Sequence, residues 1–259
     1  MKVVILAGGM GTRFAEETAL RPKPMIEIGE KPILWHIMKL YAAYGFSDFV
    51  ICCGYKGQMI KAFFLNYNAY QSNPTFHLNR NSVSVSASSV EPWKVTLANT
   101  GLRTLTAGRI LKVREYVGNE PFLLTYGDGV SDVNINNLLR FHQEHGKTIT
   151  ITVTKPEGRF GVVQLDESAT VVKGFKEKAR DDQGLVNTGF MVCEPRVFEY
   201  LGDGSTMLEA EPFERLAADG EMTAYQHDGF WSPMDTIRDR AYLEELWNSN
   251  QAPWKVWES

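Results

Sequence analysis

The stretch Leu6-Ala7-Gly8-Gly9-Met10-Gly11-Thr12-Arg13-Phe14 is the feature that most constrains the fold. The β-branched, apolar run at residues 2–7 leads directly into it and predicts a buried strand. In open parallel sheets, ligands bind beyond the carboxyl ends of the strands. Glycine amides can approach phosphate oxygens there because no side chain intervenes. The stretch therefore predicts a phosphate-binding loop at the edge of a parallel α/β sheet.

The end of this loop departs from the Gly-Lys-Ser/Thr ending of the common P-loop, because it reads Gly11-Thr12-Arg13. Thr12 adds a hydroxyl donor, and Arg13 adds a forked cation that suits phosphate. The nearest lysine further along is Lys23, which two prolines flank and stiffen. The alternatives are a tight strand-to-helix turn for the glycines and a solvated loop position for Lys23.

Strand and helix patterns alternate along most of the chain and predict a doubly wound, mixed, mostly parallel Rossmann-like sheet in a single domain, residues 1–259. The expected strands are 2–7, 49–53, 121–126, 148–154 and 189–193. The expected helices are 31–45, 58–67, 106–117, 135–145, 207–218 and 236–247. Residues 73–96 alternate polar and apolar side chains, which predicts a β-hairpin insertion, and residues 161–177 predict a twisted hairpin.

Composition excludes several classes of protein. The net charge of -4 and the lack of a basic stripe disfavour a nucleic-acid or membrane-surface partner. No run approaches the roughly 20 apolar residues of a membrane span. Because the chain begins with a strand-like run, we expect no signal peptide. The neighbours Cys52 and Cys53 lie in an apolar run, which is typical of buried thiols in a cytoplasmic protein.

Two aspartates are candidate metal ligands. Asp128 follows an apolar strand in the sequence TYGDGV, so it belongs to the same sheet edge as the glycine loop. Asp235 precedes the last helix. Two carboxylates together with bridging phosphates suit Mg²⁺. The alternatives are a β-turn aspartate for Asp128 and a helix N-cap for Asp235. Lys178, next to Glu177, could reach the same cleft or form only a surface ion pair.

Together, the GGxGTR and PKP segments identify a family, because the sequence resembles the sugar-phosphate nucleotidyltransferases essentially from end to end. The segments VEPW (90–93) and GFWSPMDTIRD (229–239) are similar to its cytidylyltransferase branch. The resemblance implies CTP and glucose 1-phosphate as substrates, Mg²⁺ as cofactor and a role in deoxysugar synthesis for surface polysaccharide. It also implies a homo-oligomer, and a hexamer for that branch.

The resemblance implies a role for each matching residue. Arg13 and Lys23 would be catalytic, and Asp128 and Asp235 would hold the metal. The sugar phosphate would contact Glu177, Lys178 and Asn187. The implied nucleotide-binding set is Leu6, Ala7, Gly8, Gly9, Gly11, Thr12, Arg13, Lys23, Thr104, Arg109 and Asp128.

The chain departs from the family pattern at Ala107, Ala179 and Thr188, and we expect preferences for base and sugar to depend on these positions. The same chemistry with UTP, dTTP or another sugar 1-phosphate is therefore an alternative. A non-catalytic sugar-nucleotide-binding homologue is another, although this chain retains the charged residues of the implied site. The 73–96 hairpin and the aromatic tail (Trp247, Trp254, Trp257) are candidate subunit interfaces.

Overall fold

A seven-stranded mixed sheet forms the centre of the molecule, in the order β14-β10-β13-β8-β1-β4-β7. The computed structural model describes residues 1–258 apart from 86–89, 156–161, 166–169 and 177–183. Strand β13 runs antiparallel to its neighbours β10 and β8, whereas the other pairs are parallel, so the predicted fold class is confirmed. The strands of this sheet are β1 (Lys2–Ala7), β4 (Asp48–Cys53), β7 (Lys94–Asn99), β8 (Phe122–Tyr126), β10 (Ile149–Thr154), β13 (Val186–Cys193) and β14 (Met222–Gln226).

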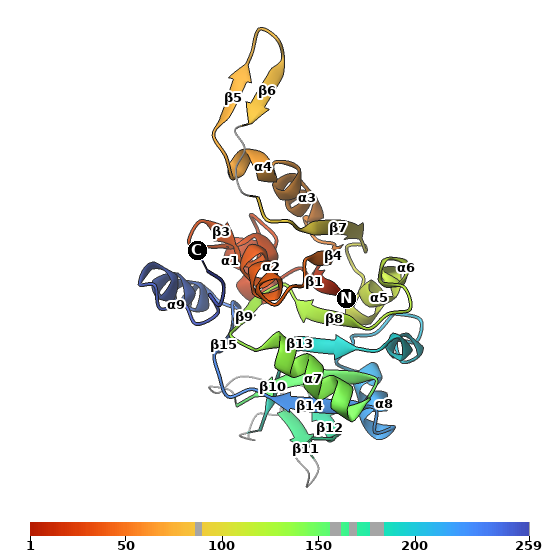
Figure 1. Cartoon of the computed structure of the whole chain (residues 1–259). Coiled ribbons are helices and arrows are strands. Elements are labelled where there is room, and N and C mark those ends of the chain that lie inside the picture. The colour runs from red at the N-terminus through yellow and green to blue at the C-terminus, as the bar shows by residue number, and fades with distance from the viewer. Residues whose placement is uncertain (86–89, 156–161, 166–169, 177–183, 259) are drawn as a thin grey trace.

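Helices cover both faces of this sheet (Figure 1). Alternate residues of β1 belong to two separate hydrophobic clusters, as the pleat of a strand requires. Val3 and Ile5 pack in one cluster with residues of α2, α3, α7 and α9, and Val4 and Leu6 pack in the other with residues of α5, α6 and α8. The helices are α1 (Ala15–Thr18), α2 (Ile33–Ala43), α3 (Gly57–Leu65), α4 (Tyr67–Tyr70), α5 (Thr106–Lys112), α6 (Arg114–Val117), α7 (Ile135–His145), α8 (Glu211–Ala218) and α9 (Ile237–Asn248).

The predicted insertion at residues 73–96 is shorter than expected. It contains an antiparallel pair, β5 (Pro74–His77) and β6 (Ser82–Val85), joined by the turn at residues 78–81. The prediction is wrong at its C-terminal end, because Lys94–Thr96 begin β7 and pair with β4 in the central sheet. Figure 1 shows the hairpin projecting from the body of the molecule beyond α3 and α4.

Among the described residues, six further strands of two to five residues form three small ladders outside the central sheet. Two of these ladders are β2 (Glu27–Ile28) with β3 (Lys31–Pro32), and β11 (Val162–Leu165) with β12 (Val172–Lys176). The second ladder lies within the hairpin predicted at 161–177. A third pair, β9 (Gly129–Ser131) with β15 (Trp231–Pro233), was not predicted, and it borders the site described below.

Helix boundaries differ from prediction where tertiary contacts intervene. The helix expected from residue 31 begins at Ile33, because Lys31 and Pro32 pair with β2. The helix expected from residue 207 begins at Glu211, because the backbone amide of Ala210 donates to the carbonyl of Met207 and closes a turn first.

The C-terminal aromatic tail packs against the chain itself. Trp254 is fully buried, and its Nε1 donates to Nδ1 of His36 at 3.3 Å. The expectation that Trp254 is an exposed interface residue is therefore wrong. Burial lowers the pKa of His36 to about 4, so its imidazole is neutral and can accept this bond.

The three cysteines Cys52, Cys53 and Cys193 are buried and unpaired with one another. Within the described ranges, no helix combines the length and the apolar character needed to cross a membrane.

Candidate active site

A pocket of about 420 Å³ opens at the edge of the sheet where the parallel strands end. The loops after β1 and β8 line it with the glycine segment and with Asp128. Because β13 is antiparallel, its beginning rather than its end reaches this edge and contributes Asn187. The pocket therefore combines segments that the sequence keeps far apart.

The glycine loop uses its glycines for different purposes. Gly11 adopts a left-handed conformation with φ of 64°, which glycine tolerates best, and the 3₁₀ turn Thr12–Phe14 follows it. A Cβ atom at Gly8 would lie 2.0 Å from Nη1 of Arg109, whereas one at Gly9 would meet nothing within 4 Å. Packing against Arg109 therefore explains why position 8 is a glycine, whereas the space beside Gly9 is open for a ligand.

Arg109 holds the glycine loop in place. Its Nη2 donates to the carbonyl of Gly8 at 2.8 Å, and its Nη1 donates to Thr100 Oγ1 at 2.6 Å and to the carbonyl of Gly101 at 2.9 Å. Arg109 lines the pocket, but these bonds direct its guanidinium to two backbone carbonyls and to the hydroxyl group of Thr100. Burial lowers its pKa, yet an arginine remains charged at neutral pH.

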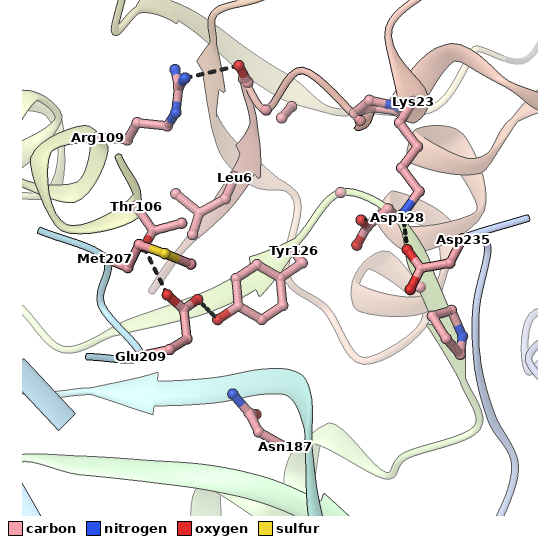
Figure 2. A pocket seen from close by; sticks show the side chains of 18 of the residues that line it. Leu6, Lys23, Thr106, Arg109, Tyr126, Asp128, Asn187, Met207, Glu209 and Asp235 are labelled. Carbon is pink, nitrogen blue, oxygen red and sulfur yellow. Dashed lines mark hydrogen bonds and ion pairs between the residues drawn. The ribbon is translucent and has the colours of Figure 1, made fainter. Parts of the chain in front are cut away.

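Lys23 lies between the two candidate metal ligands. Its ammonium contacts Asp235, and its Nζ lies 2.7 Å from Oδ2 of Asp128 (Figure 2). The lysine side chain is only 7% exposed, against 34% for Asp128 and 16% for Asp235. Burial acts to lower the pKa of Lys23, but attraction to both carboxylates outweighs it, so the pKa lies above 10.5.

Strand pairing brings the two aspartates together. Gly129, which follows Asp128, pairs with Pro233 in the β9–β15 ladder, and the amide of Met234 donates to the carbonyl of Asp128 at 2.8 Å. The alternative that Asp235 caps the last helix is wrong, because that cap is the next residue.

The N-cap of α9 is Thr236, which forms a capping box with Asp239. This arrangement satisfies the amides of Thr236 and Asp239, while the carboxylate of Asp235 is directed at Lys23.

The donor set of this site fits a cation. One ammonium reaches both carboxylates, so a single positive ion at that position can contact both. Among the residues that the structure describes, no three His, Cys, Asp or Glu side chains gather in a group that could hold a metal. A metal here would complete its coordination with water and substrate phosphates, as Mg²⁺ does in proteins.

Some of the other predicted site residues line the pocket, and others lie outside the described residues. Asn187 and Thr104 line the pocket. The amide oxygen of Asn187 accepts from the amide of Gly189 at 2.9 Å, which fixes its side chain. Glu177 and Lys178 lie outside the described residues, and so does the side chain of Arg13.

The three departures from the family pattern do not share one location. Ala107 is fully buried in the hydrophobic core and does not itself line the pocket, whereas its neighbour Thr106 does. Thr188 lines the pocket, and its hydroxyl donates to the carbonyl of Thr152 at 3.0 Å. Ala179 lies outside the described residues.

Sequence reasoning missed a cluster on the other side of the pocket, formed by Thr106, Tyr126, Met207 and Glu209 (Figure 2). The position of Tyr126 at the end of a predicted strand, two residues before Asp128, was a usable signal. Glu209 offered none, because its segment was predicted to be helical.

Comparison with known proteins identifies the relatives of this chain. The family model described as "Nucleotidyl transferase" matches residues 2–246. The chain is 52% identical over 259 residues to "Glucose-1-phosphate cytidylyltransferase" from Salmonella typhi, covering 100% of both. It is 45% identical over 258 residues to "Probable glucose-1-phosphate cytidylyltransferase" from Bacillus subtilis (strain 168), covering 99% of this chain and 100% of the relative.

A solved structure of UDP-glucose pyrophosphorylase complexed with UDP-glucose has the same fold. It superposes with a TM-score of 0.76 and covers 96% of this chain and 98% of its own, at 18% sequence identity.

Proposed function

The chain belongs to the nucleotidyl transferase family, and we propose that it transfers a cytidylyl group from CTP to α-D-glucose 1-phosphate, giving CDP-glucose and pyrophosphate. One observation carries the choice of substrates: the full-length 52% identity to a glucose-1-phosphate cytidylyltransferase. The pocket supports the chemistry, since it joins a glycine loop to a buried lysine and two carboxylates.

The reaction exchanges one phosphoanhydride bond for another. A phosphate oxygen of glucose 1-phosphate attacks the α-phosphorus of CTP, and the bond to the β-phosphate oxygen breaks as pyrophosphate leaves. The attacking group is already an anion, so no general base is needed. The work of the protein is to align two anions that repel each other and to stabilise the charge that develops.

We assign phosphate binding to the glycine loop. Its open side at Gly9 leaves space for a triphosphate, and Thr12 lines the same pocket. Lys23 would contribute its charge to the phosphates of both substrates, together with Arg13. Leu6, Ala7, Thr104 and Arg109 would complete the nucleotide subsite.

The sugar phosphate would lie on the β13 side of the pocket, next to Asn187. We assign Glu177 and Lys178 to the same subsite.

The family generally uses a divalent metal ion, and we propose Mg²⁺, held by Asp128 and Asp235. Bound there, the ion would act as a Lewis acid that neutralises charge on the phosphates. Removing divalent metal with EDTA should abolish pyrophosphate release, and adding Mg²⁺ should restore it.

The direct test is pyrophosphate release from each nucleoside triphosphate with each member of a panel of sugar 1-phosphates. We expect CTP with glucose 1-phosphate to give the highest kcat/KM. Release with UTP or dTTP but not with CTP would contradict the base assignment. No release with any pair would favour a binding protein without catalytic activity.

We also propose that the chain assembles with copies of itself through the β5–β6 hairpin, and that the assembly is a hexamer. An isolated two-stranded hairpin is marginally stable in water. This one exposes Phe76 (61%) and Leu78 (89%). Changing both residues to glutamate should reduce the mass measured by light scattering, whereas Leu20→Glu, at an exposed position elsewhere, should not. A monomeric unaltered protein would refute the proposal.

A further inference from the structure

The Glu209 cluster lies across the pocket from Lys23 and consists of Glu209, Tyr126 and Thr106 (Figure 2). We propose that Glu209 is a specificity-determining residue, whose carboxylate accepts a hydrogen bond from an uncharged donor group of a bound substrate. The proposal rests on the proposed function, because it concerns the same pocket, and it adds a residue that the phosphate chemistry does not use.

Two hydroxyl groups orient the carboxylate before a ligand arrives. Tyr126 donates its phenolic hydrogen to Oε1 of Glu209, and Oγ1 of Thr106 donates to Oε2 at 2.9 Å. Thr106 is itself fixed, since its Oγ1 accepts from the amide of Leu208 at 2.6 Å. Each carboxylate oxygen therefore accepts from a defined hydroxyl group, and a carboxylate oxygen can accept more than one hydrogen bond.

The backbone makes room for this arrangement. Gly189 has φ of 89°, and a Cβ atom at that position would lie 2.3 Å from the ring of Tyr126. Glycine there allows the tyrosine ring to lie close to β13, with its hydroxyl at Glu209. The orientation of Glu209 thus depends on three separate segments of the chain.

Charge decides which part of a substrate Glu209 can contact. The proposed substrates are both phosphate anions, and an ionised carboxylate repels phosphate. An ionised carboxylate accepts hydrogen bonds only, so Glu209 suits an uncharged donor at a distance from the phosphates.

Two donors on the proposed substrates have this chemistry: a hydroxyl group of the sugar and the exocyclic amino group of cytosine. Glu209 lies near both proposed subsites. Its partner Thr106 is two residues from Thr104 of the nucleotide subsite, and the ring of its partner Tyr126 lies close to Gly189 of β13, the strand that carries Asn187. Uracil has an acceptor where cytosine has its amino group, so the carboxylate would disfavour uracil.

Glu209→Gln is the decisive variant, because it keeps the size of the side chain and replaces one acceptor by a donor. We would measure kcat and KM for CTP and UTP with glucose 1-phosphate, and for glucose 1-phosphate and mannose 1-phosphate with CTP. If cytosine is the donor, the preference for CTP over UTP should fall about 10- to 100-fold, the scale of a hydrogen bond to a charged group. If the sugar is the donor, KM for glucose 1-phosphate should rise by a similar factor while the CTP-to-UTP ratio stays unchanged.

Tyr126→Phe is the matched control, because it removes one orienting hydroxyl and keeps the carboxylate. We expect Tyr126→Phe to change the same quantity as Glu209→Gln, either the CTP-to-UTP preference or KM for glucose 1-phosphate, by a smaller factor. The proposal is overturned if Glu209→Gln leaves the CTP-to-UTP preference, the preference for glucose 1-phosphate over mannose 1-phosphate, and the KM values for CTP and glucose 1-phosphate within about twofold of the unaltered protein. It is also overturned if the variant only lowers the melting temperature, since that is the result of a purely structural role.

These outcomes are separate from the proposed function. The unaltered protein in the same assay shows whether CTP and glucose 1-phosphate react, whereas the role of Glu209 is judged from the ratio of variant to unaltered protein.

Discussion

Replacing Lys23 by methionine tests the ion cluster and its proposed catalytic role together. Methionine keeps much of the apolar stem but removes the charge that lies 2.7 Å from Asp128 and contacts Asp235. The two carboxylates would then face each other without a cation. We expect loss of stability in the absence of metal and loss of turnover in its presence.

The size of the stability loss follows from the burial of the cluster. Removing one partner of a buried ion pair costs about 3–5 kcal/mol, because the remaining charge is uncompensated. Asp128 is 34% exposed and is partly solvated, so we expect the low end, about 3 kcal/mol. For a chain of this size that lowers the melting temperature by about 6–12 °C.

The loss of stability in Lys23→Met should be present across the neutral pH range. The pKa of Lys23 is raised above 10.5, so the stabilisation it provides is complete below its usual pKa and is lost only as pH rises through the raised value. Turnover in the variant should fall by about 100-fold or more, the scale for a preorganised charge donor.

A divalent metal should partly rescue stability but not turnover. In the unaltered protein the Lys23 ammonium occupies the position between the carboxylates, so it competes with a metal ion for them. Without that competitor, Mg²⁺ at about 100 times its dissociation constant would stabilise the variant by about 2.7 kcal/mol. The shift in melting temperature on adding Mg²⁺ should therefore be larger for Lys23→Met than for the unaltered protein.

The assay is thermal unfolding with EDTA or Mg²⁺, combined with pyrophosphate release from CTP and glucose 1-phosphate. Lys94→Met is the control, because Lys94 is 73% exposed and lies 3.2 Å from Asp48. Such a surface pair contributes at most about 1 kcal/mol. An unchanged melting temperature together with near-normal turnover in Lys23→Met would refute the reasoning.

Three further predictions concern other parts of the chain. Gly8→Ala should destabilise the protein because its Cβ would collide with Arg109, whereas Gly9→Ala should keep the melting temperature and raise KM for CTP. Because burial lowers the pKa of His36 to about 4, the unfolded chain binds the extra proton between pH 6.5 and 4, so the free energy of unfolding should fall by up to about 3 kcal/mol as pH falls through that window. Denaturant titrations of His36→Asn should show a flatter pH profile. Trp254→Ala should cost about 3–5 kcal/mol in the same titrations, since the side chain is fully buried.

Local patterns were sufficient to predict much of the fold. The apolar run at residues 2–7 became β1 with the same bounds, and the helix expected at residues 135–145 became α7. Both elements have a hydrophobic pattern that their final environment matches, so local preference and tertiary packing agree. Short elements such as β9 and β15 were missed because they exist only through pairing with each other.

Within the pocket, the sequence by itself determined the residue types that could meet phosphate and metal: the glycine loop, Lys23 between its prolines, and Asp128 at a strand end. Only the tertiary structure decided which of them meet. Lys23 lies 105 residues from Asp128 and 212 from Asp235, and the β9–β15 ladder joins the two carboxylates. The same holds for Arg109, whose partner Gly8 is 101 residues away. The physical reason is that local propensity acts over a few neighbouring residues, whereas hydrogen bonds and ion pairs form between any groups that packing brings together.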